Sequence, residues 1–312
     1  ARLLDFLTPA ELGALASTSK PNLRLVRANT SALYMLEPMA NQFSSAMRNY
    51  QNVGTLAIAS PSDLGEREMH EMSLLKHLHT LRIFDTFMLS PQSLMKTLWN
   101  LRSLRELYLD FGDIATNFET DRDAWKESKA SLRSLAGLTR LEKLTLLSIP
   151  PAWNVISFEA LESLVHLRTL DLTYVVPPDT LDFLEPMKHL QNLALGLAER
   201  EVGRPGLALE LPELPLLEHL EAIDFCFTPS SLSRQPRLRF LEFTPYGWLQ
   251  EDLSAIRALE NLRHASLHLT WLPNLRVVSN SLSHLTSLTL IEFDISRCVA
   301  LCGLRNLAML SL

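Results

Sequence analysis

Leucines recur along this chain in one arrangement, and residues 161–172, with the sequence LESLVHLRTLDL, give its clearest copy. Leu164, Leu167, Leu170 and Leu172 form an L-x-x-L-x-x-L-x-L pattern. A spacing of three is typical of helical turns, whereas residues two apart on a strand, here Leu170 and Leu172, point to the same side. The pattern predicts a short strand joined to a helical segment, a unit that buries its apolar side only against copies of itself.

The residue that opens each predicted strand, which we call the anchor, can be placed at eleven positions. Most intervals between anchors fall within the roughly 20 to 29 residues of leucine-rich repeats. The segments between them, such as FEALESLVHL at 158–167, space apolar residues by three and four and predict helices. The predicted anchors are Leu56, Leu81, Leu107, Leu144, Leu170, Leu193, Ile223, Leu241, Ala265, Leu288 and Leu310.

These repeats predict an α/β fold, a right-handed leucine-rich-repeat solenoid with parallel strands inside and helices outside. Residues 51–312 are assigned to about eleven repeats, an array expected to be incomplete at its C-terminal end, and residues 1–50 to a small helical unit. The asparagine or cysteine that usually stands five residues after the anchor is absent, and Thr86 and Thr228 occupy two of these positions. Either water and threonine hydroxyls satisfy the backbone there, or the turns are irregular.

Two intervals between anchors are too long for one repeat. A charged segment, 121–129, follows Leu107, and several prolines and glycines follow Leu193. Insertions of this kind loop out from one side of a repeat array. We favour tolerated surface loops as the interpretation, with binding loops as the alternative.

Composition and charge narrow the classes of function. The chain is 47% hydrophobic, enough for a large core, and its net charge of −6 argues against the concentrated basic surface that nucleic-acid binding requires. No apolar run approaches the roughly 18 residues of a membrane helix. Three cysteines without a spaced framework favour a reducing compartment. We therefore expect neither nucleic acid nor membrane as a partner, and a cytoplasmic location.

The first twenty residues predict a capped helix. Thr8 can cap it, Pro9 suits its first turn, and Glu11 can complete a capping box. The segment 3–20, LLDFLTPAELGALASTSK, resembles the second half of an F-box, in which a leucine-proline turn leads into an acidic-leucine helix and then a basic residue. The opening Leu-Pro pair of an F-box would precede Ala1, so the F-box-like segment is expected to be incomplete at its N-terminal end.

Together with the repeats, this segment makes the chain similar to the F-box/LRR family. The resemblance implies binding to the adaptor of a cullin-RING ubiquitin ligase. The alternative is a plain helical cap that shields the apolar side of the first repeat. The residues that the resemblance assigns to adaptor binding are Leu3, Leu4, Leu7, Pro9 and Leu12.

Alternate strand positions predict a binding surface. The anchor and the residue two later should enter the core, so their neighbours should face the inner, concave surface. Carboxylates outnumber basic residues there, and aromatic residues supply contacts typical of interfaces, which favours a protein partner with a basic or apolar patch. The alternative is a solvated sheet face without a partner. The predicted partner-binding residues are Arg82, Phe84, Glu106, Tyr108, Asp110, Lys143, Asp171, Asp224, Phe240, Glu242 and His264.

Candidates for catalysis or metal binding are few. Several histidines stand just before the leucine that precedes an anchor by three, so recurrence at one repeat position explains them better than a site does. They are His77, His166, His189, His219 and His284. His264 and His268 would share a strand face, but about 13 Å apart, too far for one metal ion. Phosphate-binding glycine loops and nucleophile motifs do not occur, and we expect no enzyme, cofactor or metal site.

The leading hypothesis is a non-catalytic protein-binding module that acts as the substrate receptor of a cullin-RING (SCF-type) ubiquitin ligase and binds its substrate on the concave face. The resemblance to the F-box carries the ligase part of this hypothesis. Two alternatives remain: an interaction scaffold without a ligase role, and the recognition half of a bacterial effector ubiquitin ligase. The nucleus, or the host cytosol for an effector, is the corresponding alternative location.

Overall fold

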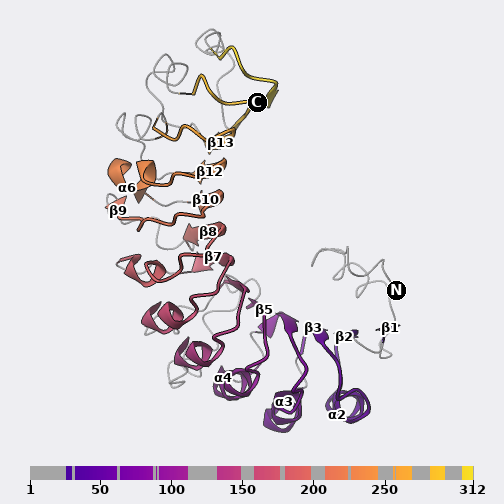
Figure 1. Cartoon of the computed structure of the whole chain (residues 1–312). Helices are drawn as coiled ribbons and strands as arrows, with labels where there is room; N and C mark the ends of the chain where they lie inside the picture. The colour runs from indigo at the N-terminus through magenta and orange to yellow at the C-terminus, as the bar shows by residue number, and fades with distance from the viewer. Residues whose placement is uncertain are drawn as a thin grey trace, which may run out of the picture. The chain divides into compact units, whose positions relative to one another are not determined.

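The chain forms two compact units, residues 1–164 and 165–312, and each contains parallel strands with helical segments on one side (Figure 1). In the part of the chain that the structure describes, no helix is long and apolar enough to cross a membrane. This computed structural model describes residues 26–29, 32–61, 64–86, 89, 91–111, 132–148, 158–175, 180–197, 208–223, 226–244, 256, 258–268, 282–291 and 304–311.

In the first unit, strand and helical segment alternate. The strands follow one another across the sheet in chain order, parallel from β2 onward, whereas β1 is antiparallel to β2. The elements are β1 (Val26–Asn29), β2 (Ala32–Leu36), α2 (Ala40–Asn49), β3 (Thr55–Ala59), α3 (Glu66–Ser73), β4 (Thr80–Phe84), α4 (Pro91–Asn100), β5 (Glu106–Asp110), the 3-10 helix η4 (Leu132–Gly137), β6 (Lys143–Leu147) and the 3-10 helix η6 (Phe158–Ser163).

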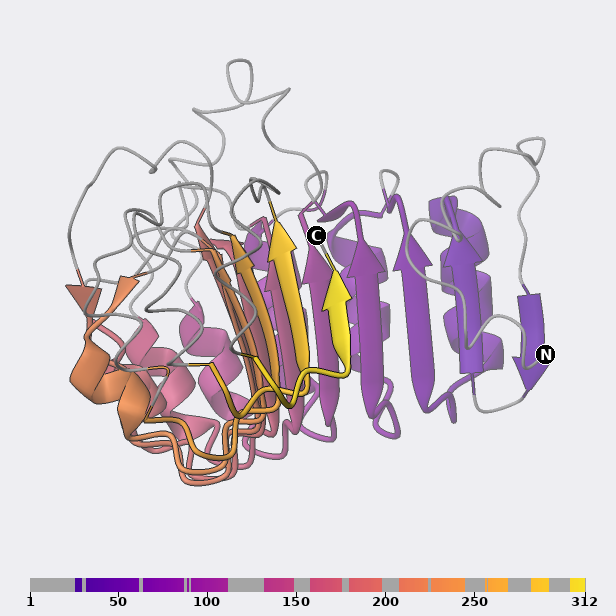
Figure 2. The same ribbon diagram turned by 90° about the horizontal axis from the view of Figure 1, so that it is seen from above.

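In the second unit, the strands are again parallel, in the order β7, β8, β10, β12, β13, β14 and β15. In Figure 2, which views the chain from above, the orange and yellow strands of this unit point the same way. β9 and β11 pair in parallel with each other and form a separate two-stranded sheet. The elements are β7 (Thr169–Val175), the 3-10 helix η7 (Asp182–Leu184), β8 (Asn192–Leu197), β9 (Ala208–Leu209), β10 (His219–Ile223), β11 (Cys226–Phe227), α6 (Pro229–Ser233), β12 (Phe240–Thr244), β13 (His264–His268), β14 (Ser287–Ile291) and β15 (Met309–Ser311).

Neighbouring strands share one register, and this stacks the leucines into columns. Leu56 pairs with Leu81, for example, and Leu170 pairs with Leu193. The anchors of both units are buried, apart from Leu310 in β15, which is 43% exposed. Each buried leucine contributes about 2 kcal/mol of transfer free energy, so the columns supply the main stabilisation of each unit. The chain is therefore a leucine-rich-repeat solenoid, as the leucine spacing predicts.

Ten of the eleven predicted anchors open a strand of the parallel sheet, and the prediction is wrong at Ile223. The register of β10 sets Leu220 against Leu193 on one side and Leu241 on the other, so Leu220 is the anchor. Its neighbour Ala222 is fully buried rather than facing a partner. Leucines and Ile223 follow one another at steps of three from 214 to 223, so the L-x-x-L frame can be placed one step too late.

The repeats also begin earlier than the sequence indicates. β2 is parallel to β3 and sets Leu33 against Leu56, and α2 follows it as the other helices follow their strands. Residues 32–50 thus form a repeat of the same kind, whereas the sequence places them in the small helical unit. The predicted helix at 158–167 is the short 3-10 helix η6. The segment before β8 contains the short 3-10 helix η7, after which Pro186 cannot continue an α-helix.

The turn after the strand shows how backbone groups form hydrogen bonds in the absence of the usual asparagine. The fourth residue after the anchor has a positive φ in several repeats: Glu37, Ser60, Asp85 and Ser148. The N–H groups of Glu37 and Ser60 donate to the last carbonyl of the next strand, at 2.9 and 3.1 Å. The Thr86 hydroxyl, fully buried, donates to the carbonyl of Asp110 at 3.1 Å, which confirms the threonine alternative there.

Candidate functional site

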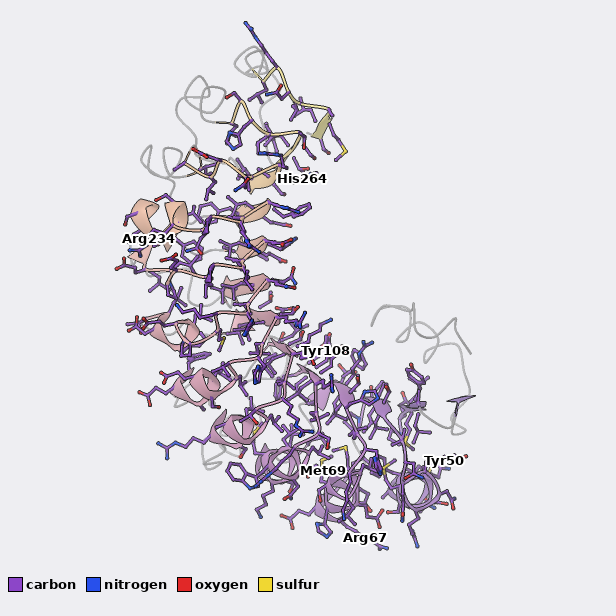
Figure 3. The ribbon with its side chains drawn as sticks, viewed as in Figure 1. Tyr50, Arg67, Met69, Tyr108, Arg234 and His264 are labelled. Carbon is purple, nitrogen blue, oxygen red and sulfur yellow. The ribbon has the colours of Figure 1, made fainter. Side chains whose placement is uncertain are left out.

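Each sheet has an open face, formed by the strand side chains that point away from the leucine columns. Figure 3 shows Tyr108 and His264 on this side of their strands, with Met69 between α3 and the sheet and Arg234 on the side of the helical segments. Alternation along the strands places these residues, because Leu107 and Leu109 on either side of Tyr108 are fully buried. The open face of each unit is described in turn.

On the open face of the first unit, the charged side chains neutralise one another. Arg82 donates to one carboxylate oxygen of Glu106 through Nε at 3.2 Å and Nη2 at 2.9 Å. Lys143 approaches the same oxygen at 3.8 Å. Since these pairs are partly exposed, each contributes on the order of 0.5 kcal/mol. The acidic side chain of Glu106 is thus already occupied by two cations.

Beside these charges lies an aromatic pair. The rings of Phe84 and Tyr108 have centroids 4.9 Å apart and are tilted by 46°. Phe84 is only 9% exposed, so it serves mainly as part of the surface's support. Asp110, also predicted as a contact, occupies the last position of β5 on the same face and is half-buried.

On the open face of the second unit, three rings form a stack across adjacent strands. Phe240 of β12 lies between His219 of β10 and His264 of β13, with centroid distances of 5.5 and 4.4 Å and interplanar angles of 22° and 4°. Strand register brings them together, because Phe240 pairs with His219 on one side and His264 on the other. Phe240 remains 39% exposed. The stack places a partly exposed phenylalanine ring between two imidazoles on this face.

A row of carboxylates runs beside the ring stack, two residues further along the strands. Glu221 pairs with Glu242 on β12, and Asp171 of β7 lies in the same row, two strands away. Burial raises the pKa of Glu221, and the negative charges of Glu242 and Asp171 raise it further. Asp171 also accepts hydrogen bonds from the hydroxyl and N–H of Thr173 at 2.6 and 3.2 Å. The negative charge of this face is therefore concentrated in the row.

Sequence reasoning missed two members of this face. His219 and Glu221 lie half-buried on the open face of β10 because the anchor is Leu220. The available signal was the motif Leu217-x-x-Leu220-x-Ala222, whose last residue is small. Two histidines of the predicted row, His166 and His189, do stack at 6.3 Å as a repeat position requires.

The other predicted residues divide between the open faces and the parts of the chain that the structure does not describe. Asp224 lies outside the described residues, as do the predicted adaptor contacts Leu3, Leu4, Leu7, Pro9 and Leu12. The remaining predicted contacts lie on the open faces, at the positions that strand alternation predicts. They are Arg82, Phe84, Glu106, Tyr108, Asp110 and Lys143 in the first unit and Asp171, Phe240, Glu242 and His264 in the second.

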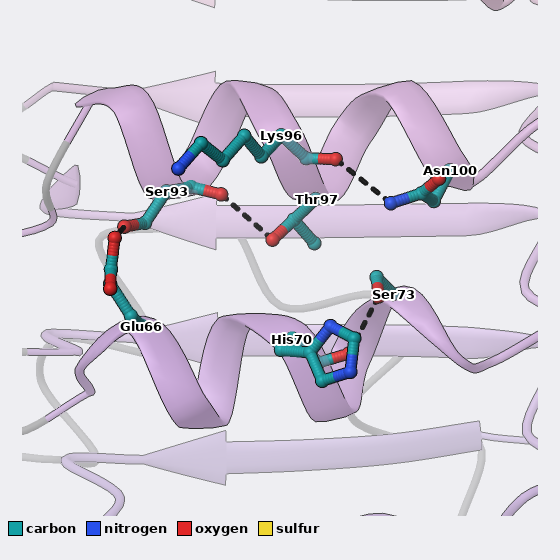
Figure 4. Close-up of a pocket in the computed structure, with 7 residues that line it drawn as sticks. All are labelled: Glu66, His70, Ser73, Ser93, Lys96, Thr97 and Asn100. Atoms are coloured by element: carbon teal, nitrogen blue, oxygen red, sulfur yellow. Dashed lines mark hydrogen bonds between the residues drawn. The ribbon is translucent and has the colours of Figure 1, made fainter.

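A polar groove of about 200 Å³ lies between α3 and α4, on the helical side of the first unit (Figure 4). Its inner wall carries Ser93 and Thr97, and both hydroxyls already have partners. Thr97 donates within 2.9 Å of the carbonyls of Met69 and Ser93, and Ser93 donates to Glu66 at 3.3 Å. The bonds to Met69 and Glu66 hold adjacent helices together, so the two inner hydroxyls of the groove are used by the fold.

Metal binding finds no support in the described ranges, where no group of three histidine, cysteine or carboxylate side chains is close enough to hold an ion.

Comparisons with known proteins add the fold class of several solved structures. No family model matches the sequence, and no curated protein is significantly similar to it. The chain is similar to an internalin (inlF) of Listeria monocytogenes str. 4b F2365, at 16% identity and a TM-score of 0.41, over 90% of this chain and 86% of that one.

Two further solved structures are similar over most of the chain. One is an octameric complex of latrophilin 3, Unc5D and the LRR of FLRT2, at 14% identity and a TM-score of 0.46, over 84% of this chain and 83% of that one. The other is a complex of Rad7 and Elc1 in yeast, at 14% identity and a TM-score of 0.42, over 99% of this chain and 89% of that one. The strand register of the chain itself remains the basis for assigning the fold.

Proposed function

We propose that this chain is a non-catalytic protein-binding module that holds a partner protein on the open face of its second unit. The observation that carries the proposal is the ring stack of His219, Phe240 and His264 beside the carboxylates of Glu221 and Glu242. Aromatic side chains fixed in place lose little entropy when a partner packs on them, and such residues dominate the energetics of interfaces.

The stack meets the requirements of a contact surface better than the groove between α3 and α4 does. Its central ring, Phe240, is 39% exposed, so apolar surface is in contact with water. A partner that covers this surface gains free energy from its burial. Neighbouring rings hold Phe240 on both sides, so the surface is formed before a partner arrives. In the groove, by contrast, the inner hydroxyls of Ser93 and Thr97 are bound within the fold.

The proposal extends to a role as the substrate receptor of a cullin-RING ubiquitin ligase, in the cytoplasm or nucleus. Its support is the F-box-like segment at residues 3–20, in which Leu7, Pro9 and Leu12 would contact the adaptor. In such an arrangement the chain performs no chemistry itself. It raises the local concentration of the bound substrate near the ligase.

Substitution of the central ring tests the binding face. A partner recovered with the wild-type chain should bind Phe240→Ala about tenfold or more weakly, because truncation of an aromatic contact at an interface costs on the order of 2 kcal/mol. The matched control is Trp99→Ala, since Trp99 is 46% exposed on the helical side of the first unit. Equal effects of both variants, or no effect of Phe240→Ala, would overturn the proposed face.

The ligase role requires a separate measurement. The full chain, with residues 1–25 present, should bind the purified F-box adaptor, and the double variant Leu7→Ala/Pro9→Ala should lose this binding while it keeps the partner bound to the open face. If the wild-type chain fails to bind the adaptor, the ligase role is wrong and the interaction scaffold remains.

A further inference from the structure

Two adjacent strands of the second unit each carry an aromatic ring followed, two residues later, by a carboxylate. On β10, His219 is followed two residues later by Glu221, and on β12, Phe240 is followed two residues later by Glu242. The register sets ring against ring and carboxylate against carboxylate. Residues two apart on a strand are about 6.8 Å apart, and adjacent strands are about 4.8 Å apart. The result is two ring and carboxylate pairs side by side.

The two adjacent carboxylates of these pairs favour a cation as the ligand. On the first unit's open face, Arg82 and Lys143 both bind Glu106. At Glu221, the neighbouring charges that raise its pKa are the carboxylates of Glu242 and Asp171. A positively charged partner group between Glu221 and Glu242 would remove this repulsion, so electrostatic complementarity favours a basic ligand.

The stack determines which part of a basic side chain it can contact. Each face of the Phe240 ring is covered by an imidazole, at 5.5 and 4.4 Å, so the ring edges form the exposed ridge. A ridge of edges suits the apolar stem of a long side chain better than a cation placed over a ring face. Ring and carboxylate stand on residues two apart, about 6.8 Å along the strand, a spacing that such a long side chain can span.

Arginine fits these features better than lysine. Its planar guanidinium binds carboxylates through two parallel hydrogen bonds and can span neighbouring carboxylates, whereas the lysine ammonium is a compact, strongly hydrated charge. Two arginines on one side of an extended chain are two residues apart, about 6.8 Å, which lets each reach one of the two adjacent pairs.

We infer that His219, Glu221, Phe240, Glu242 and His264, named here the ring-carboxylate surface, bind two alternate arginine side chains of an extended basic segment in the partner protein. Each stem lies against the ring stack and each guanidinium reaches the carboxylates of Glu221 and Glu242. This inference rests on the proposed function, because it specifies the partner of the same face.

A short peptide tests the inference on the full chain. The probe is a capped heptapeptide with arginine at its third and fifth positions and serine or glycine elsewhere, titrated at low salt into protein with labelled histidine rings. NMR signals of His219 and His264 should shift, whereas those of His166 and His189, which lie in turns before their strands, should not. Citrulline in place of both arginines should weaken binding about tenfold, because it removes two ion pairs and keeps the shape. Lysine in both places should weaken it severalfold.

Variants separate this site from general electrostatic attraction. Glu221→Gln/Glu242→Gln should weaken the arginine peptide about tenfold. The control, Glu185→Gln/Glu260→Gln, makes the same charge change at exposed turn residues and should leave affinity unchanged. The inference is overturned if the citrulline peptide binds equally well, if the lysine peptide binds more tightly, or if both double variants weaken binding alike.

These outcomes differ from a failure of the proposed function. If Phe240→Ala releases the partner protein but the arginine peptide does not bind, the open face is correct and the arginine ligand is wrong. If Phe240→Ala leaves the partner bound, the proposed face itself is wrong.

Discussion

At the residue scale, Glu221 shows that the open face carries charge at a cost to stability. Burial and the neighbouring carboxylates of Glu242 and Asp171 raise its pKa, so its ionised form is less favourable in the folded chain than in the unfolded chain. Between its usual value of 4.5 and the raised folded value, the folded chain binds more protons. Stability contributed by this group therefore falls as pH rises through that window.

Glu221→Gln should consequently raise the urea midpoint at pH 7, because a neutral amide removes both the burial cost of the carboxylate and its repulsion by Glu242 and Asp171. At a pH well below 4.5 the two proteins should have the same midpoint, because the wild-type carboxyl is then protonated in both states. The matched control is Glu260→Gln at an exposed turn, which should change neither value. A lower midpoint for Glu221→Gln at pH 7 would contradict the carboxylate repulsion described for this row.

At the element scale, the buried side-chain amide of Gln235, just after α6, holds the segment before β10 in place by hydrogen bonds. Gln235, 2% exposed, accepts from the Leu214 N–H at 3.1 Å and donates to the carbonyls of Pro212 and Ser231, both at 3.0 Å. Close by, Arg234 joins the same two segments through an exposed ion pair with Glu210 at 2.8 Å. The buried amide of Gln235 and the exposed ion pair of Arg234 join the same two segments, so their contributions to the free energy of unfolding can be compared directly.

Gln235→Ala should lower the free energy of unfolding by about 2 to 4 kcal/mol, because it leaves buried backbone groups of Leu214 and Pro212 without partners. Arg234→Ala should lower it by less than about 1 kcal/mol, since its ion pair is exposed to solvent. Urea unfolding of the two variants beside the wild type measures both values. A larger loss for Arg234→Ala would contradict the role given to burial.

Element scale is also where sequence reasoning succeeds and fails. Ten of the eleven anchors that leucine spacing predicts are correct, because a buried column tolerates few other residues. The spacing misses Leu33, because the apolar spacing around this strand is typical of a helix and Pro38 follows closely. It places the anchor of β10 at Ile223 instead of Leu220, because several steps of three occur there in succession. The ring stack depends on which residues of three separate strands lie opposite one another, so an error at one anchor hides His219 and Glu221.

At the scale of the whole molecule, each repeat packs mainly on its neighbours, as in other solenoids. A cavity in one repeat should therefore loosen nearby strands and leave distant ones unchanged. Leu193→Ala should cost about 2 to 5 kcal/mol locally and speed amide hydrogen exchange in β7, β8 and β10 but not in β3 or β4. Leu81→Ala, an equally buried anchor of the first unit, should give the reverse pattern. Uniform acceleration in both variants would contradict nearest-neighbour stabilisation.

The central claim at this scale is that the partner protein binds the open face of the second unit. Site-specific photo-crosslinking tests it most directly, with a benzophenone amino acid placed at Phe240 of β12, at the exposed Trp99 of α4, or at Tyr108 on the other open face. The account predicts efficient crosslinks to the partner from position 240 and none from position 99. Crosslinks from position 99 without any from position 240 would contradict it.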